Sequence, residues 1–107
     1  MEGSFEERER QFEAKFAHDQ EIKFKANAHR DKLFATWAAD QLGENAPPEY
    51  SETLLEFAFG RKPEELIERV KNDLHDHGVA QAEIKIRRAY EMCADQARED
   101  VMKDLGA

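Results

Sequence analysis

The stretch SFEERERQFEAKFAHDQEIKFKANAHRDKLFATWAADQ, residues 4–41, decides the fold, because it contains no glycine or proline and predicts one long helix. At about 100° per residue, Phe5, Phe12 and Phe16 fall on one face of that helix. A second apolar stripe is centred on a face rotated by roughly 70°, and it consists of Ile22, Ala26, Leu33 and Trp37. We therefore expect the second stripe to pack on a core while the Phe face stays free for a partner. Folding of the three rings back into the core is equally compatible with the periodicity alone.

Local signals in the sequence also predict where this first helix begins and ends. Ser4 and Glu7 match a capping box, which predicts a helix that begins at Phe5. Three acid-before-base pairs, spaced four residues apart, support its continuation: Glu6–Arg10, Asp19–Lys23 and Glu21–Lys25. Gly43 is expected to end the helix, and the two prolines that follow, Pro47 and Pro48, mark the clearest break in the chain.

Three further helices follow, and no segment has the alternating pattern of a strand. A helix over about 49–59 is predicted by Tyr50, Leu54, Phe57 and Ala58, with Leu55 and Phe59 widening its apolar side. A helix over about 63–77 opens at Pro63, closes before Gly78 and carries the stripe Leu66, Ile67, Val70 and Leu74. A helix over about 80–105 carries the row Ile86, Tyr90, Cys93, Ala97 and Val101.

These patterns predict an all-α fold, a small four-helix bundle with a long first helix whose amino-terminal part is mobile or extends from the bundle. We divide the chain into an amphipathic segment, residues 1–19, and a four-helix domain, residues 20–107, in which the first helix covers about 20–42. At 107 residues and 12.4 kDa the chain is one small domain. Its core is therefore expected to be modest.

Composition excludes several classes of function. A formal net charge of −8 opposes binding to nucleic acid or to an anionic membrane surface. No signal peptide and no membrane span is recognisable, which predicts a soluble intracellular protein without direct membrane insertion. The glycines are scattered and form no phosphate-binding loop, and no set of titratable groups converges on a pocket. We expect neither an enzyme nor a cofactor.

Two local features could indicate a specific site, either a metal site or a nucleophilic cysteine. The run His75-Asp76-His77 resembles a metal site, but residues two apart point to different sides of a helix and zinc usually takes four ligands, so no metal is expected. Cys93 is the only cysteine, and its place in the apolar row of the last helix favours packing over nucleophilic chemistry.

The amino-terminal run Arg8-Glu9-Arg10-Gln11-Phe12-Glu13-Ala14-Lys15-Phe16-Ala17-His18-Asp19 also resembles a known family. Together with Phe24-Lys25-Ala26, Arg30, Lys32-Leu33 and Trp37-Ala38-Ala39, it is similar to the zeta subunit, the ATPase inhibitor of alphaproteobacterial F-type ATP synthases. A looser match over Arg69-Val70-Lys71, Asp73-Leu74 and Gly78-Val79 extends the resemblance over most of the chain.

The resemblance implies a function and a set of partners. Zeta subunits are four-helix proteins whose amino-terminal segment is mobile alone and inserts as a helix between the alpha and beta subunits, near the gamma rotor. There it blocks ATP hydrolysis and permits synthesis. The location implied is cytoplasmic, peripheral to the inner membrane through the synthase, and a weak contact with ADP or ATP is a further possibility.

The inhibitory segment of the family falls on residues 1–19 here. Its expected partner-binding residues are Phe5, Arg8, Arg10, Phe12, Lys15, Phe16 and His18. Whether His18 confers pH dependence is left open by the sequence, and such an effect would be seen as inhibition that changes between about pH 6 and 8. The alternative function is a helical adaptor that binds a different protein through the same Phe face.

Overall fold

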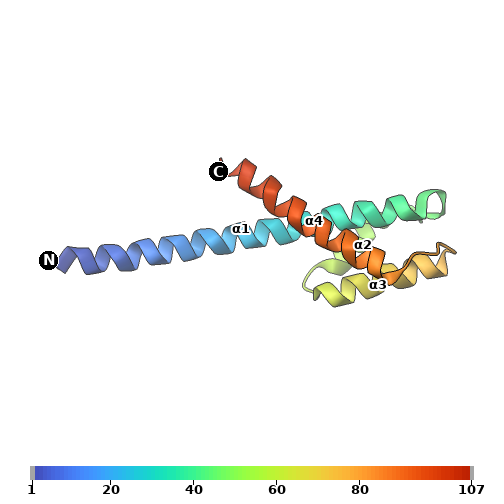
Figure 1. Cartoon of the computed structure of the whole chain (residues 1–107), viewed down its shortest axis with the longest axis horizontal. Coiled ribbons are helices and arrows are strands. Elements are labelled where there is room, and N and C mark those ends of the chain that lie inside the picture. Colours follow the sequence, from blue (N-terminus) through green and yellow to red (C-terminus); the bar gives the residue numbers. More distant parts are fainter. Residues whose placement is uncertain (1, 107) are drawn as a thin grey trace.

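A computed structural model describes residues 2–106 of the chain and the side chains of residues 6–106. Over these residues the fold is four α-helices and one short 3₁₀ helix, with no strand (Figure 1). In chain order they are α1 Glu2–Leu42, η1 Gly43–Asn45, α2 Tyr50–Ala58, α3 Pro63–Asp76 and α4 Glu83–Asp104. The prediction of an all-α fold with a long first helix is confirmed.

Helix α1 is 41 residues long, which corresponds to about 60 Å. It begins at Glu2, so Ser4 lies inside the helix and the predicted capping box is wrong, because a capping residue must stand outside the helical turns. Gly43, with a φ of 55°, ends the helix as predicted. Of the three predicted acid–base pairs, the structure forms Lys25–Glu21, with 2.9 Å between Nζ and Oε1.

The remaining helices lie within a few residues of their predicted bounds. Helix α3 begins at Pro63, the expected first position, and Gly78 follows its end with a φ of 74°. Helix α4 begins at Glu83, three residues later than predicted from Ala80. Ala82, the residue before it, is extended, and its methyl side chain accepts no hydrogen bond from the free N–H groups at the start of the helix. A stretch without a capping side chain gives no local signal for the start of a helix.

The bundle occupies the end of α1 that is distant from the amino terminus. Figure 1 shows α4 running back across α1, with α2 and α3 packed beside the second half of α1. Phe34 of α1 is fully buried at the centre of this core. Its ring meets Tyr90 of α4 edge-on, with centroids 5.1 Å apart, and stacks on Trp37 at 5.7 Å.

The buried face of α1 differs from the predicted one. Of the predicted stripe only Ala26 is buried, whereas Ile22, Leu33 and Trp37 are half-buried. The centre of the core is instead formed by Phe34, Ala35, Ala38 and Leu42. Because α1 packs against α4 on one side and against α2 on another, the most buried ridge lies where the two contacts meet.

This finding also corrects the argument from two rotated stripes. Phe16 and Phe34 are 18 residues apart, about five full turns, so they point in nearly the same direction. Phe34 is buried, whereas Phe16 is 59% exposed. The exposure of the Phe face therefore results from the length of α1, which continues past the other helices, and not from a rotation of the face.

The apolar rows of the other helices are largely as predicted. All four residues of the α3 stripe are buried, and so are Ile86, Tyr90, Ala97 and Val101 of α4. Cys93 is half-buried against the core, which confirms its packing role, and burial raises the pKa of its thiol. Leu55 and Phe59 are exposed, so the widened side of α2 faces solvent.

Polar contacts also join the helices. The hydroxyl of Tyr50 donates to Asp73 Oδ2 at 2.7 Å, and the guanidinium of Arg87 donates twice to the carboxylate of Glu64, each at 2.8 Å. His29 Nε2 lies 2.9 Å from Asp100 Oδ2 and links α1 to the last turns of α4. This contact stands close to where α1 leaves the bundle.

Candidate partner-binding interface

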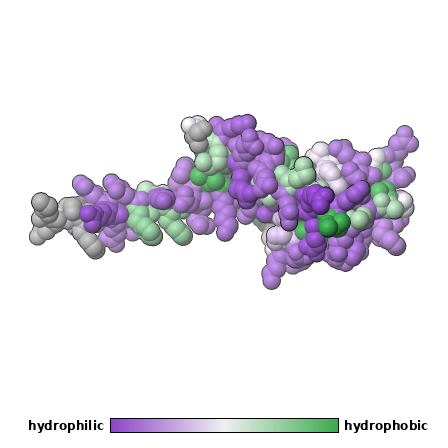
Figure 2. All heavy atoms as spheres, viewed as in Figure 1, coloured by the Kyte–Doolittle hydropathy of each residue, from purple (hydrophilic) through white to green (hydrophobic). Residues whose placement is uncertain are grey.

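The amino-terminal half of α1 extends beyond the rest of the molecule. We call residues 2–21 the arm, because every described side chain from residue 6 to residue 21 is exposed and Ile22 is the first half-buried one. Figure 1 shows the arm continuing well past the end of α4. Figure 2 shows hydrophobic atoms gathered midway along it, among hydrophilic ones. The arm thus presents an apolar patch to solvent.

The patch is centred on Phe12 and Phe16. Their exposed fractions are 72% and 59%, and a spacing of four residues places them one turn apart on the same face. The structure therefore brings these two predicted anchors together and leaves both uncovered. Phe5 belongs to the backbone of α1, but its side chain lies outside the described residues.

Charged residues border the patch asymmetrically. By helix geometry Arg8 and Lys15 lie along one edge of the Phe face, and Glu9 and Glu13 lie along the other. All four side chains are exposed. Two predicted cations thus stand where a partner that covers the rings would also meet them, and the two glutamates were not among the predicted site residues.

The other two predicted residues lie on different faces. Arg10 and His18 are each about 140° around the helix from the Phe patch, on opposite sides. His18 stands near Glu21, whose pKa is lowered by the hydrogen bond and charge of Lys25 and to a smaller extent by His18. Roles for Arg10 and His18 in binding stay predictions.

A cleft at the root of the arm was not predicted from the sequence. It is formed between α1 and α4, has a volume of about 290 Å³, and includes Lys23 and Arg30 of α1 and Arg98 of α4 among its lining residues. Lys23 and Arg98 are 75 positions apart in the chain. No local pattern could therefore have brought them together before the fold was known.

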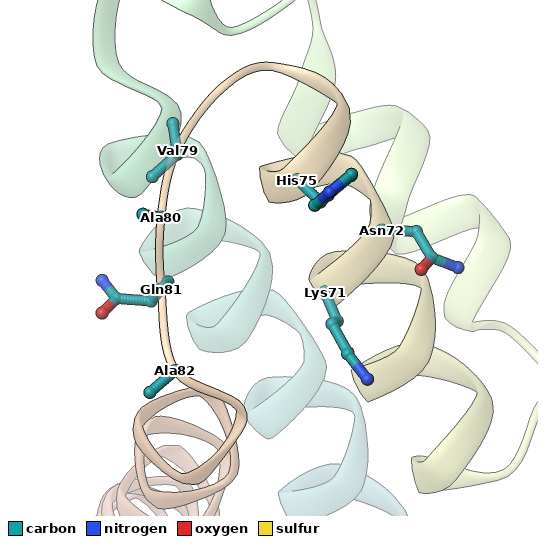
Figure 3. A pocket seen from close by; sticks show the side chains of 7 residues that line it. All are labelled: Lys71, Asn72, His75, Val79, Ala80, Gln81 and Ala82. Atoms are coloured by element: carbon teal, nitrogen blue, oxygen red, sulfur yellow. The ribbon is translucent and has the colours of Figure 1, made fainter.

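A second hollow lies at the far end of the bundle, where α3 leads into α4. Its lining residues come from α3, with Lys71, Asn72 and His75, and from the extended segment of residues 79–82, and Figure 3 shows this segment running beside α3. Lys71 is engaged with Glu83, at 3.7 Å. Figure 1 shows the connection from α3 to α4, which lines this hollow, at the opposite end of the molecule from the arm. The expected weak contact with ADP or ATP stays a prediction.

The histidine run at the end of α3 is divided between two environments. His77 Nδ1 lies 2.7 Å from the carbonyl oxygen of Asp73, whereas the side chain of His75 is 89% exposed. Across residues 2–106 the structure places no group of three or more His, Cys, Asp or Glu side chains so that they could hold a metal ion.

None of the helices in the described part of the chain combines the length and the apolar character needed to cross a bilayer.

Comparison with known proteins identifies the family. The sequence profile of ATPase inhibitor subunit zeta matches residues 1–100, which is nearly the whole chain and includes the arm. The chain belongs to the ATPase inhibitor subunit zeta family. No curated protein and no solved structure matches it.

Membership in the zeta family gives the arm a context. The chain is by family an inhibitory subunit that acts on an ATPase, and such subunits are generally not enzymes themselves. The resemblance noted in the sequence is thus confirmed at the level of the family. An inhibitor of this kind requires a surface that binds the enzyme.

Proposed function

We propose that this zeta-family chain blocks ATP hydrolysis by an F-type ATP synthase by inserting its arm into the catalytic interface between the alpha and beta subunits, near the gamma rotor. The observation that carries the proposal is the pair of exposed rings, Phe12 and Phe16, on a helix that extends beyond its own bundle. Helix-in-groove recognition uses apolar anchors spaced three, four or seven residues apart. Phe12 and Phe16 fit this spacing.

Continuity of α1 with the bundle makes such insertion more favourable. Starting a helix costs more than extending one, because the first turn fixes several residues for a single hydrogen bond. In α1 the packed turns around Phe34 supply that start, and the arm adds residues to an existing helix. Arg8 and Lys15 can add charge-assisted hydrogen bonds at the edge of the patch.

Inhibition of hydrolysis without inhibition of synthesis needs a difference between enzyme states. A ligand that binds every state equally shifts no equilibrium. We propose that the arm fits an interface conformation that occurs during hydrolytic rotation, and that rotation in the synthetic direction expels it. The family supports this direction of action, and the residues of the arm do not by themselves require it.

Removal of the two rings tests the proposal directly. In Phe12→Ala plus Phe16→Ala, the concentration that halves ATP hydrolysis by the cognate membrane-bound synthase is expected to rise by at least about tenfold, because burial of each ring contributes about 2 kcal/mol. The measurement is steady-state hydrolysis against added protein.

The matched control removes two exposed apolar side chains elsewhere, with Phe59→Ala plus Ile84→Ala, which are 86% and 65% exposed in the wild type. This control is expected to inhibit as the wild type does. Undiminished inhibition by the double arm variant would exclude the Phe patch as the inhibitory surface.

A further inference from the structure

The cleft at the root of the arm has an apolar floor. Ala26 is buried and Ile22 is half-buried at the bottom, and Ala94 of α4 forms part of the opposite wall. Figure 1 shows α4 diverging from α1 toward its carboxyl end, which opens the space between the two helices. The cleft therefore lies directly beside the start of the arm, since Asp19 belongs to both.

The charge of this cleft is opposite to that of the chain. Its charged lining residues are three cations, Lys23, Arg30 and Arg98, and a single carboxylate, Asp19. The chain as a whole carries 16 basic and 24 acidic residues. A cationic cleft on an acidic protein is complementary to a negatively charged side chain of a partner.

Two of the three cations are available for a partner. Arg30 pairs with Asp31 at 2.9 Å and lies over the ring of Tyr90, so it is held by the bundle. Arg98 pairs with Asp95 on the exposed side of α4. Because such an exposed pair contributes only about 0 to 1 kcal/mol, Arg98 can leave Asp95 and bind a carboxylate of the partner instead. Lys23 forms no ion pair with any described residue.

The cleft is in line with the Phe patch. Lys23 follows Phe16 by seven residues, which is two turns, so both point to the same side of α1 about 10 Å apart. A partner segment that covers Phe12 and Phe16 and runs along the arm passes Asp19, which follows Phe12 by seven residues, and then reaches Lys23. Rings and cleft together form one continuous strip on α1.

We propose that the cleft binds a carboxylate on the same partner segment that takes up Phe12 and Phe16. This inference rests on the proposed inhibitory function and adds a chemical requirement for the partner, which is an aspartate or glutamate about 10 Å beyond the site that receives Phe16. Lys23 and Arg98 supply charge-assisted hydrogen bonds to that carboxylate. The cleft thereby fixes where along the partner the arm stops.

Removal of the two available charges tests the inference. In Lys23→Gln plus Arg98→Gln, the concentration that halves ATP hydrolysis by the cognate synthase is expected to rise about tenfold, since hydrogen bonds to charged groups are lost. Inhibition by this variant is also expected to depend less on salt than inhibition by the wild type, because fewer charges contribute. A merely structural role of the two residues would not change the salt dependence.

The matched control is Lys85→Gln plus Arg88→Gln, which removes the same charge from two exposed positions on the first turns of α4. It is expected to inhibit within about twofold of the wild type, because neither residue lines the cleft. Since both double variants lose the same net charge, a difference between them reports the loss of contacts in the cleft and not a long-range charge effect. Thermal unfolding checks that both double variants fold as the wild type does.

The outcomes separate this inference from the proposed function. If the cleft variant inhibits as strongly as its control and with the same salt dependence, the carboxylate site is excluded while the inhibitory arm stands. If the wild type itself leaves hydrolysis unchanged, the proposed function is excluded and the inference with it. A selective loss in the cleft variant, with the control unaffected, supports the site.

Discussion

Two phenylalanines of α1 show how position along a helix decides the role of a residue. Phe16 and Phe34 have the same chemistry and nearly the same direction on the helix, yet Phe34 has no exposed surface and Phe16 is mostly exposed. Only the presence of Tyr90 and the other core residues at one level of α1 distinguishes them. Sequence periodicity indicates to which side of a helix a residue points, but it does not indicate whether another helix covers that side.

Their removal should therefore have different consequences for stability. Phe34→Ala is expected to lower the free energy of unfolding by about 3 to 5 kcal/mol, because it leaves a cavity in the core. Phe16→Ala is expected to change it by less than about 0.5 kcal/mol, as exposed substitutions usually do. Urea unfolding followed by helical circular dichroism measures both. Equal destabilisation by the two would contradict the extended arm.

At the scale of elements, α4 carries a polar atom that the bundle does not satisfy. Tyr90 is buried against α1, with Phe34 at its edge and Arg30 over its ring, and its hydroxyl has no hydrogen-bond partner among the described residues. Burial is the main cause that raises the pKa of Tyr90 to about 12. The contact between α1 and α4 therefore disfavours the ionised phenol.

This feature predicts a stability that depends on alkaline pH. Because the folded pKa of Tyr90 lies above the unfolded value of 10.0, folding loses stability as the pH rises from about 10 toward 12, where the unfolded chain ionises first. Tyr90→Phe is expected to remove this part of the loss and to leave stability at pH 7 equal or slightly higher. Thermal midpoints of wild type and variant from pH 7 to 11.5 provide the measurement. Parallel curves over that range would refute the burial of an unpartnered hydroxyl.

The sequence predicted the buried face of those helices that carry one regular apolar series. The stripe of α3 and the row of α4 are examples, since Leu74 and Ile86 each belong to a single regular series. Helix α1 has neighbours on two sides, so its most buried residue, Phe34, lay outside the predicted stripe. The start of α4 was missed because Ala82 caps nothing.

The candidate site was predictable to the same degree. Phe12 and Phe16 follow from helical spacing along one segment, and Arg8 and Lys15 accompany them because they are sequence neighbours. The cleft could not be predicted in this way, because it depends on a tertiary contact. Arg98 and Lys23 line the same cleft only after α4 has folded back across α1. A single sequence carries no record of which helices cross or at what level.

The shape of the whole molecule follows from its arm. Its radius of gyration is 18.4 Å and its extents are 68 × 25 × 24 Å, whereas a compact domain of this length would have a radius of about 13 Å. The difference arises because α1 projects beyond a bundle of ordinary size (Figure 1). The bundle contributes stability, and the arm contributes reach.

Removal of the arm should separate these two contributions. A chain that begins at Gln20 is expected to keep its thermal midpoint within a few degrees, because the buried core residues all lie beyond that point. Its radius of gyration in solution is expected to fall to about 12 to 14 Å, and inhibition of ATP hydrolysis should be lost. Small-angle scattering and the hydrolysis assay test the two halves. Full inhibition by the shortened chain would refute the assignment of the arm.

Because α1 is one uninterrupted helix from Glu2 to Leu42, a rotation of the bundle also moves the arm. The two ends of α1 are about 60 Å apart, so a tilt of the bundle by about 10° displaces the tip of the arm by about 10 Å, roughly the thickness of a helix. If the arm inserts as proposed, a second molecule that binds the bundle and tilts it would displace the tip from its binding site without contacting the tip. Under the proposed function, release from inhibition could therefore begin at the bundle and not at the arm.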